Sequence, residues 1–145
     1  MDVTDSVINL RSPRDGDASL IVTARDEEFR RWLGPGPGTP NPTACIVVQG
    51  EVVGWVDHDH EPEHDWLDAN EANLGYFVFA EHPRKGYAAR SVELFVHLLR
   101  GDKRYTTASL LIDPENGPSL AVARRCEFVL VGELNGQFYF TRSVS

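Results

Sequence analysis

The chain has 145 residues, of which 41% are apolar and 25% are charged, and its formal net charge at pH 7 is −8. This length suits one globular domain that buries roughly two thirds of its extended surface, and the composition excludes a disordered or fibrous chain. No apolar run approaches the roughly 20 residues of a membrane-spanning helix, and the acidic charge argues against a nucleic-acid surface, which would gather Lys and Arg.

The amino-terminal half predicts a first strand at residues 7–10 and a helical stretch at 17–33 that forms one helix or two short ones. Residues 34–42 hold four prolines and three glycines, so we expect a loop there. A hairpin of strands at 45–48 and 52–56 follows.

The carboxyl-terminal half shows the order strand, turn, helix twice and then a closing hairpin. The expected strands lie at 74–79 and 109–112, and the hairpin joins 128–133 to 137–142 across Asn135-Gly136, a dipeptide suited to a turn with positive φ. Strands that alternate with helices in this order predict an α/β fold, with a mixed, mostly antiparallel sheet flanked by helices in a single domain of residues 1–145.

The first of these turns has the chemistry of a phosphate cradle. A helix that begins near residue 87 would leave about four backbone N–H groups free at its first turn, where the helix dipole also favours an anion. Arg84, Lys85 and Arg90 add full positive charges beside these donors, and Gly86 lets a phosphate approach the backbone.

Charge is distributed unevenly along the chain. No Lys or Arg lies between Arg31 and Arg84, whereas residues 57–73 hold seven carboxylates, Asp57, Asp59, Glu61, Glu63, Asp65, Asp68 and Glu71. A basic segment beside an acidic one suits an anionic cofactor that meets a cationic acceptor. A solvated acidic loop is the alternative.

The sequence from 74 to 128 resembles the GNAT superfamily of N-acetyltransferases, and within it the RimJ/RimL type. Members typically show an Arg/Gln-x-x-Gly-x-Gly/Ala turn and a later Asn-x-x-Ser before a Gly-Phe pair. Residues 83–88, Asn116 to Ser119 and Glu127-Phe128 occupy those positions here, and residues 10–18 look like the first strand and the start of the first helix.

The resemblance implies acetyl-CoA as co-substrate and direct attack of a primary amine on its thioester. The diphosphate would lie on the backbone from Arg84 to Ala89. The pantetheine arm would lie like an extra strand beside Tyr76, Phe77 and Val78, and Asn116 would hydrogen-bond this arm. Ser119 would return a proton to the departing thiolate, although helix capping is an alternative role for it. The implied cofactor-binding residues are Tyr76, Phe77, Val78, Arg84, Lys85, Gly86, Tyr87, Ala88, Ala89 and Asn116.

The sequence also departs from the family pattern. Ala123 stands where many relatives carry a proton-donating Tyr, and Leu111 where alanine-acetylating relatives carry Glu. Glu71 is our first candidate for the general base, with Asp57 and His58 as alternatives. The acceptor would be a protein N-terminal α-amine or a small cationic amine, and because no base is clear, the lower cost of neutralising an α-amine favours the former. A non-catalytic module that senses acyl-CoA is the competing hypothesis.

Other features carry less weight. His58, His60 and His64 stand among acids, but we predict no metal site, because this stretch looks like a loop without the rigid elements of a ligand shell. Cys45 and Cys126 lie inside apolar patterns and are expected to be buried thiols. No secretory signal pattern is seen, so we expect a cytoplasmic protein that contacts neither nucleic acid nor membrane. The oligomeric state is left open, a homodimer included.

Overall fold

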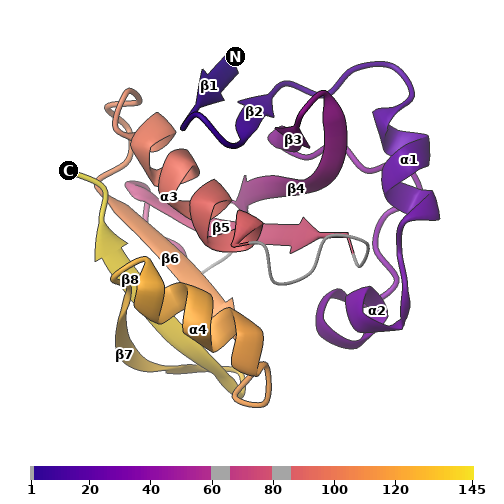
Figure 1. Cartoon of the computed structure of the whole chain (residues 1–145). Coiled ribbons are helices and arrows are strands. Elements are labelled where there is room, and N and C mark those ends of the chain that lie inside the picture. Colours follow the sequence, from indigo (N-terminus) through magenta and orange to yellow (C-terminus); the bar gives the residue numbers. More distant parts are fainter. Residues whose placement is uncertain (1, 60–65, 80–85) are drawn as a thin grey trace.

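The computed structural model describes residues 2–59, 66–79 and 86–145. These residues form one eight-stranded sheet with the strand order β1-β2-β3-β4-β5-β6-β8-β7, and four helices lie against it (Figure 1). In chain order the elements are β1 (Asp2–Thr4), β2 (Asn9–Arg11), α1 (Asp17–Thr23), α2 (Glu27–Leu33), β3 (Ala44–Val48), β4 (Glu51–Asp59), β5 (Glu71–Val78), α3 (Tyr87–Leu99), β6 (Thr107–Ile112), α4 (Gly117–Arg125), β7 (Val129–Leu134) and β8 (Gln137–Ser143).

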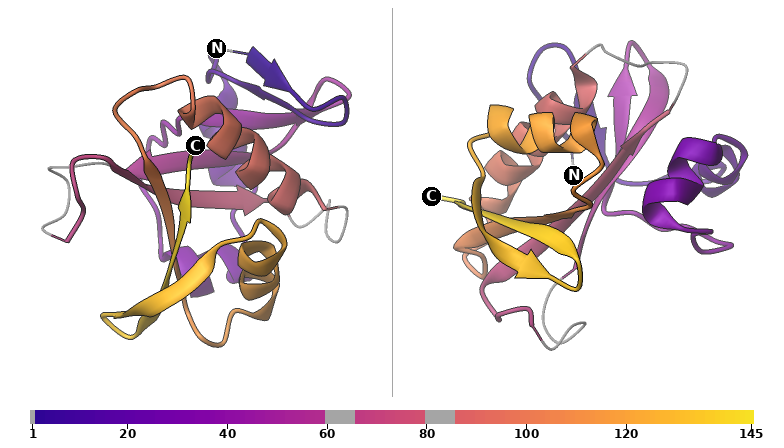
Figure 2. Two further views of the ribbon diagram at one scale, coloured as in Figure 1. Left: turned by 90° about the vertical axis from the view of Figure 1, so that its left-hand side faces the viewer. Right: turned by 90° about the horizontal axis from the view of Figure 1, so that it is seen from below.

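The helices cover both faces of the sheet, as the alternation of strands and helices predicts. Figure 2 shows α3 and α4 on one face and α1 and α2 on the other. The helical stretch at 17–33 is two helices, because Asp26 adopts an extended conformation and its side chain caps α2 by accepting a hydrogen bond from Phe29 N at 2.9 Å.

The closing hairpin turns at the expected Asn135-Gly136 dipeptide, and the β3–β4 hairpin turns at Gln49-Gly50. Gln49 and Gly50 both have positive φ, 50° and 80°, and Asn135 and Gly136 have φ of 52° and 82°. Paired positive φ values match the right-handed twist of the flanking strands, which is why Asn-Gly and related pairs favour tight hairpins. The first expected strand is displaced to β2, and β1, which pairs with it, was not predicted.

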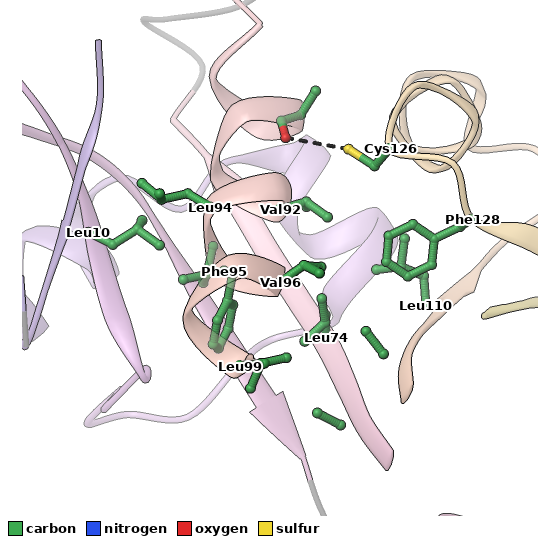
Figure 3. Close-up of a cluster of buried hydrophobic side chains, with 14 of the residues drawn as sticks. Leu10, Leu74, Val92, Leu94, Phe95, Val96, Leu99, Leu110, Cys126 and Phe128 are labelled. Carbon is green, nitrogen blue, oxygen red and sulfur yellow. Dashed lines mark hydrogen bonds between the residues drawn. The ribbon is translucent and has the colours of Figure 1, made fainter. Parts of the chain in front are cut away.

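The core lies between α3 and the sheet (Figure 3). Val92, Phe95 and Val96 of α3 pack at no more than 1% exposure, together with buried residues of β5, β6 and the segment after α4. Cys126 is also buried, and its thiol donates to Ala89 O at 3.4 Å. This contact and the apolar packing fix the first turn of α3 beside the end of α4.

Pairing between β5 and β6 is parallel, unlike every other strand pair of the described sheet, and it is short. It joins Glu71 to Thr107, Ala72 to Ala108 and Asn73 to Ser109, and then stops. β5 continues beside β4 to Val78, while β6 continues beside β8 to Ile112. The two strands therefore separate beyond Asn73 and Ser109, and this divergence opens the sheet.

Candidate active site

A cavity of about 660 Å3 occupies the opening between β5 and β6. Its walls are the diverging strands themselves, the start of α4, part of β4, and side chains of α2. The lining includes Glu28, Trp32, Trp55, Asp57, His58, Asp59, Trp66, Asn73, Leu74, Gly75, Tyr76, Phe77, Val78, Ala88, Leu110, Leu111, Ile112, Asp113, Asn116 and Ser119.

The open edge of β5 presents unpaired main-chain groups to this cavity. Phe79 N donates to Val53 O at 2.8 Å, and the β4–β5 register continues unbroken from that pair. Main-chain bonds alternate in direction along an antiparallel pair, so Phe77 faces β4 with its backbone. Tyr76 and Val78 turn their N–H and C=O groups toward the divergent side. An extended ligand arm could add there as a strand.

The amino terminus of α3 supplies the second set of free donors. Gly86 has φ of 76° and precedes α3, and Arg90 N is the first amide to bond back to Gly86 O, at 3.1 Å. Ala88 and Ala89 therefore keep first-turn N–H groups without intrahelical acceptors. Arg84 and Lys85 lie outside the described residues.

A basic side chain that the sequence analysis did not assign lies beside this helix start. A methyl group added at Gly86 would stand 3.6 Å from Arg125 Nη1. Arg125 comes from the last turn of α4, 39 residues further along the chain, so only the packing of α4 against α3 reveals it. The positive charge of Arg125 therefore lies beside the amino terminus of α3, which is also the positive end of the helix dipole.

The start of α4 brings two polar side chains into the cavity. Asn116 caps the helix, and its Oδ1 accepts from Ser119 N at 3.3 Å. Ser119 is thus not the cap itself. Its Oγ accepts a hydrogen bond from Tyr76 Oη at 3.0 Å, and burial raises the pKa of Tyr76 to about 12, an effect that this hydrogen bond partly offsets.

Acidic and aromatic side chains gather at the other end of the cavity. Glu28 and Trp32 come from α2, where Trp32 Nε1 donates to Glu28 Oε1 at 2.9 Å. Trp55 and Asp59 come from β4, and Trp66 from the segment before β5. Trp55 Nε1 is buried and makes no hydrogen bond to any described residue, which leaves an indole donor without its usual acceptor.

Asp57 and His58 share one threonine. Asp57 Oδ1 accepts from Thr43 N at 3.1 Å and from Thr43 Oγ1 at 2.9 Å. Thr43 Oγ1 also lies 2.8 Å from His58 Nδ1. The single hydroxyl proton of Thr43 can serve only one of these two partners at a time, so the tautomer of His58 decides which group donates in the Thr43–His58 contact.

Glu71 lies away from this group. It is 4% exposed at the start of β5, it is not among the cavity-lining residues, and one of its oxygens accepts from Tyr139 Oη at 2.6 Å. Burial and this carboxylate together raise the pKa of Tyr139. Of the three base candidates, Asp57 and His58 line the cavity and Glu71 does not.

A comparison with protein-family models identifies the family of this chain. A family model described as an acetyltransferase (GNAT) domain matches residues 40–129, more than half of the chain. The chain belongs to the GNAT acetyltransferases. It is therefore an N-acetyltransferase with acetyl-CoA as co-substrate. The match begins just before β3 and ends at the first residue of β7, so it includes β4, β5, β6 and the start of α4 but not α2.

Solved structures of GNAT enzymes share this fold. A GNAT acetyltransferase from Bacillus anthracis is 12% identical, with 99% of each chain covered and a TM-score of 0.82. Aminoglycoside acetyltransferase AAC(6')-Ib in complex with coenzyme A is 15% identical, with 94% of each chain covered and a TM-score of 0.79. Mycobacterium smegmatis RimJ in complex with CoA-disulfide is 17% identical over 94% of this chain and 81% of that one, with a TM-score of 0.76. No curated protein matches the sequence.

The geometry of this GNAT enzyme fits its co-substrate. The α3 amino terminus and Arg125 offer the donors and charge that a diphosphate needs, and the open β5 edge offers main-chain partners for a pantetheine amide arm. The side-chain roles of Arg125, Trp32 and Trp66 were missed from the sequence because each depends on a contact between distant segments. The acidic run at 57–73 was the one sequence feature that pointed to a cationic acceptor.

The remaining sequence predictions can be placed as well. Both cysteines are buried, as predicted, and burial raises the pKa of each thiol to about 11. Among residues 2–59, 66–79 and 86–145, no group of three or more His, Cys, Asp or Glu side chains could hold a metal ion. His60 and His64 lie outside that part of the chain. None of its helices is long and apolar enough to cross a membrane.

Proposed function

We propose that this GNAT enzyme transfers the acetyl group of acetyl-CoA to a primary amine of a cationic acceptor, and that a small cationic amine is favoured over a protein N-terminal α-amine. The observation that carries this proposal is the continuity of one cavity, with free main-chain donors at its β5 end and carboxylates and indoles at its α2 end.

The RimJ/RimL type remains our assignment within the family, supported by the Asn116 to Ser119 motif. We also propose that residues 1–145 act as one domain, in the cytoplasm, where two free thiols are ordinarily kept reduced.

The co-substrate would be held by the chain in three places. The first-turn amides of Ala88 and Ala89, with Gly86, Tyr87 and Arg125 beside them, would bind the diphosphate, joined by Arg84 and Lys85. Tyr76 and Val78 would pair with the pantetheine arm through their main chain, with Phe77 and Asn116 on its walls. When bound, acetyl-CoA supplies an activated acetyl group as a thioester.

Acceptor choice follows from charge and from the cost of deprotonation. Neutralising an α-amino group of pKa about 8 costs about 1.4 kcal/mol at pH 7, whereas a lysine-like amine of pKa about 10.4 costs roughly 4.6 kcal/mol. Glu28, Asp59 and Asp113 line the cavity and would attract a cation, but they would also raise the pKa of the reacting amine. An acceptor with a second positive group resolves this conflict, because the second group occupies the carboxylates while the reacting amine loses its proton.

The aromatic side chains add a further requirement. Trp55 and Trp66 line the cavity, where they would contact a cation or a sugar-like ring, whereas Arg31 already lies over the Trp32 ring at 4.3 Å. The buried Trp55 Nε1 has no acceptor among the described residues. A hydroxyl or carbonyl oxygen on the acceptor would satisfy it. AAC(6')-Ib, which shares the fold, has been solved in complex with coenzyme A and kanamycin, a hydroxylated polyamine. We infer an acceptor of the same chemical kind, with several amines and several hydroxyls.

Proton transfer would use residues of the cavity wall. The His58 imidazole or the Asp57 carboxylate would accept the amine proton, in preference to Glu71, whose carboxylate is engaged by Tyr139. Ser119 would donate to the departing sulfur.

The test is release of free thiol from acetyl-CoA, with the acetylated product identified by mass spectrometry. The acceptor panel holds hydroxylated polyamines, simple diamines, monoamines and peptides with free amino termini. We expect the highest kcat/KM with polyamines that carry hydroxyls. Asp59→Asn should lower kcat/KM for polyamines by about tenfold without changing acetyl-CoA affinity in calorimetry, since a pair of this kind is worth about 1–2 kcal/mol.

Asp102→Asn is the matched control, because Asp102 follows α3 and does not line the cavity. It removes the same charge and should leave kcat/KM unchanged. If no amine releases thiol although acetyl-CoA binds, the acetyl-transfer proposal is wrong and the sensing hypothesis gains. If only peptide amino termini react, the acceptor class is wrong while the reaction stands.

A further inference from the structure

Two hydroxyl groups meet inside the cavity from opposite walls. Tyr76 extends from β5 and Ser119 from the first turn of α4, 43 residues apart, and their oxygens are 3.0 Å apart. Tyr76 Oη is the donor and Ser119 Oγ the acceptor. Among the described residues, Ser119 Oγ makes no other hydrogen bond, so its own proton is not committed to the protein.

The surrounding helix lacks a phenol of its own. Ala123 is four residues after Ser119, on the same face of α4, and it is fully buried. The Ser119 side chain is therefore the hydroxyl group that this face of α4 places in the cavity beside Tyr76. The phenol reaches the same place from the strand, with its ring packed against the core.

We propose that Tyr76 acts through Ser119 as a positioning and proton-relay residue for the departing thiol. This inference rests on the proposed function, since it assigns a role in acetyl transfer. The hydrogen bond from Tyr76 fixes the Ser119 hydroxyl in one rotamer, with its proton directed into the cavity. Tyr76 also supplies the proton that Ser119 gives away.

The step balances in atoms and charge. The amine nitrogen forms a bond to the acyl carbon, and the carbon–sulfur bond breaks with its electron pair on sulfur. The Ser119 proton moves to sulfur, the Tyr76 proton moves to Ser119 Oγ, and the phenolate takes a proton from water. The general base in the cavity wall, His58 or Asp57, takes the proton lost by the amine. The net change is therefore one proton moved from nitrogen to sulfur.

The relay has a physical reason. A serine that donates alone becomes an alkoxide. Transfer through Tyr76 places the transient negative charge on a phenolate instead, and a phenol is a stronger acid than a serine hydroxyl. Burial raises the pKa of Tyr76 to about 12, so the phenol keeps its proton at neutral pH and is ready to donate. The hydrogen bond geometry, and not this value, carries the assignment.

The test is a double-mutant cycle of Tyr76→Phe and Ser119→Ala with acetyl-CoA and the best acceptor. Tyr76→Phe keeps the ring and removes only the donor, so we expect kcat to fall on the order of tenfold, within the range of general acid catalysis. KM for acetyl-CoA should stay within about twofold. Ser119→Ala should cost at least as much, and the double variant should be no slower than Ser119→Ala, because residues that act in series are non-additive. The solvent deuterium isotope effect on kcat should decrease in Tyr76→Phe.

Tyr105→Phe is the matched control, since Tyr105 is a buried tyrosine outside the cavity lining whose hydroxyl accepts only a 3.4 Å contact from Arg104. It should change melting temperature as much as Tyr76→Phe does and leave kcat unchanged. An active wild type whose kcat is unaffected by Tyr76→Phe, or a cycle in which the two losses multiply, overturns the relay alone. A wild type that releases no thiol with any amine overturns the proposed function, and the relay with it.

Discussion

Gly54→Ala should damage the site through the backbone, without touching any predicted functional side chain. Gly54 pairs with Val78 in the β4–β5 ladder. A Cβ added there would lie 2.2 Å from Phe77 O and 3.0 Å from Val78 Cα. Both neighbours are main-chain atoms, so no side-chain rotation can relieve the contact, and β4 must move away from β5 where β5 offers its free edge.

The size of the effect follows from that displacement. Cβ atoms essentially never approach within 3.0 Å, so the strands must separate by nearly 1 Å. Overpacking of this kind costs about 1–3 kcal/mol, against which alanine regains about 0.4–1 kcal/mol by restricting the unfolded chain. We expect a net loss of about 1–2 kcal/mol, or roughly 2–8 °C in melting temperature. A misplacement near 1 Å should also lower kcat by up to about a hundredfold.

The assay combines urea unfolding, thiol release and calorimetry with acetyl-CoA. Gly132→Ala is the control, because Gly132 is also a strand glycine without positive φ and a Cβ there would meet nothing within 4 Å. It should leave both stability and kcat near wild type. Equal stability and activity in Gly54→Ala and wild type would show that β4 and β5 do not approach as closely as argued here.

Three further outcomes are expected. Asp17→Asn should lower the free energy of unfolding at pH 7 by about 1.5–3 kcal/mol, because a buried ion pair with Arg11 at 2.7 Å is weakened. The hydrogen bond from Arg11 lowers the pKa of Asp17, so this contribution is present above about pH 4 and is lost as pH falls through the folded-state pKa; a difference between wild type and variant that grows in acid would contradict the assignment. Cys45 and Cys126 should resist thiol reagents in the folded protein at pH 8 and react after unfolding, since burial raises both pKa values to about 11. Asn116→Ala should cost about 1 kcal/mol of stability through the lost cap and weaken acetyl-CoA binding in calorimetry, and unchanged stability would show that the cap bond at 3.3 Å contributes little.

Local patterns were sufficient for most elements of this fold, β1 excepted. Asn135 and Gly136 have the positive φ values that their residue types predict, and the loop at 34–42 contains no regular structure. Each of these features depends on the φ and ψ preferences of a few neighbouring residues, which the sequence states directly. The expected phosphate cradle rests on the same kind of local pattern, and its Arg84 and Lys85 lie outside the described residues.

Contacts between distant segments escaped the sequence. Glu71 was favoured as a base from its place in an acidic run, yet Tyr139, 68 residues later, engages its carboxylate and it does not line the cavity. β1 is three residues long and pairs only with β2, so it has no periodicity to detect. Arg125 approaches Gly86 only because α4 packs beside α3.

The sequence by itself determined most of the strands, helices and turns, β1 excepted, and that the two thiols are buried. Tertiary structure decided where the sheet opens, because β5 and β6 part after three residue pairs and each then follows a different neighbour. That divergence brings Tyr76 to Ser119 and the indoles to the carboxylates. The physical reason is that backbone preference acts between neighbours in the chain, whereas strand pairing and side-chain packing join residues that only the complete fold brings together.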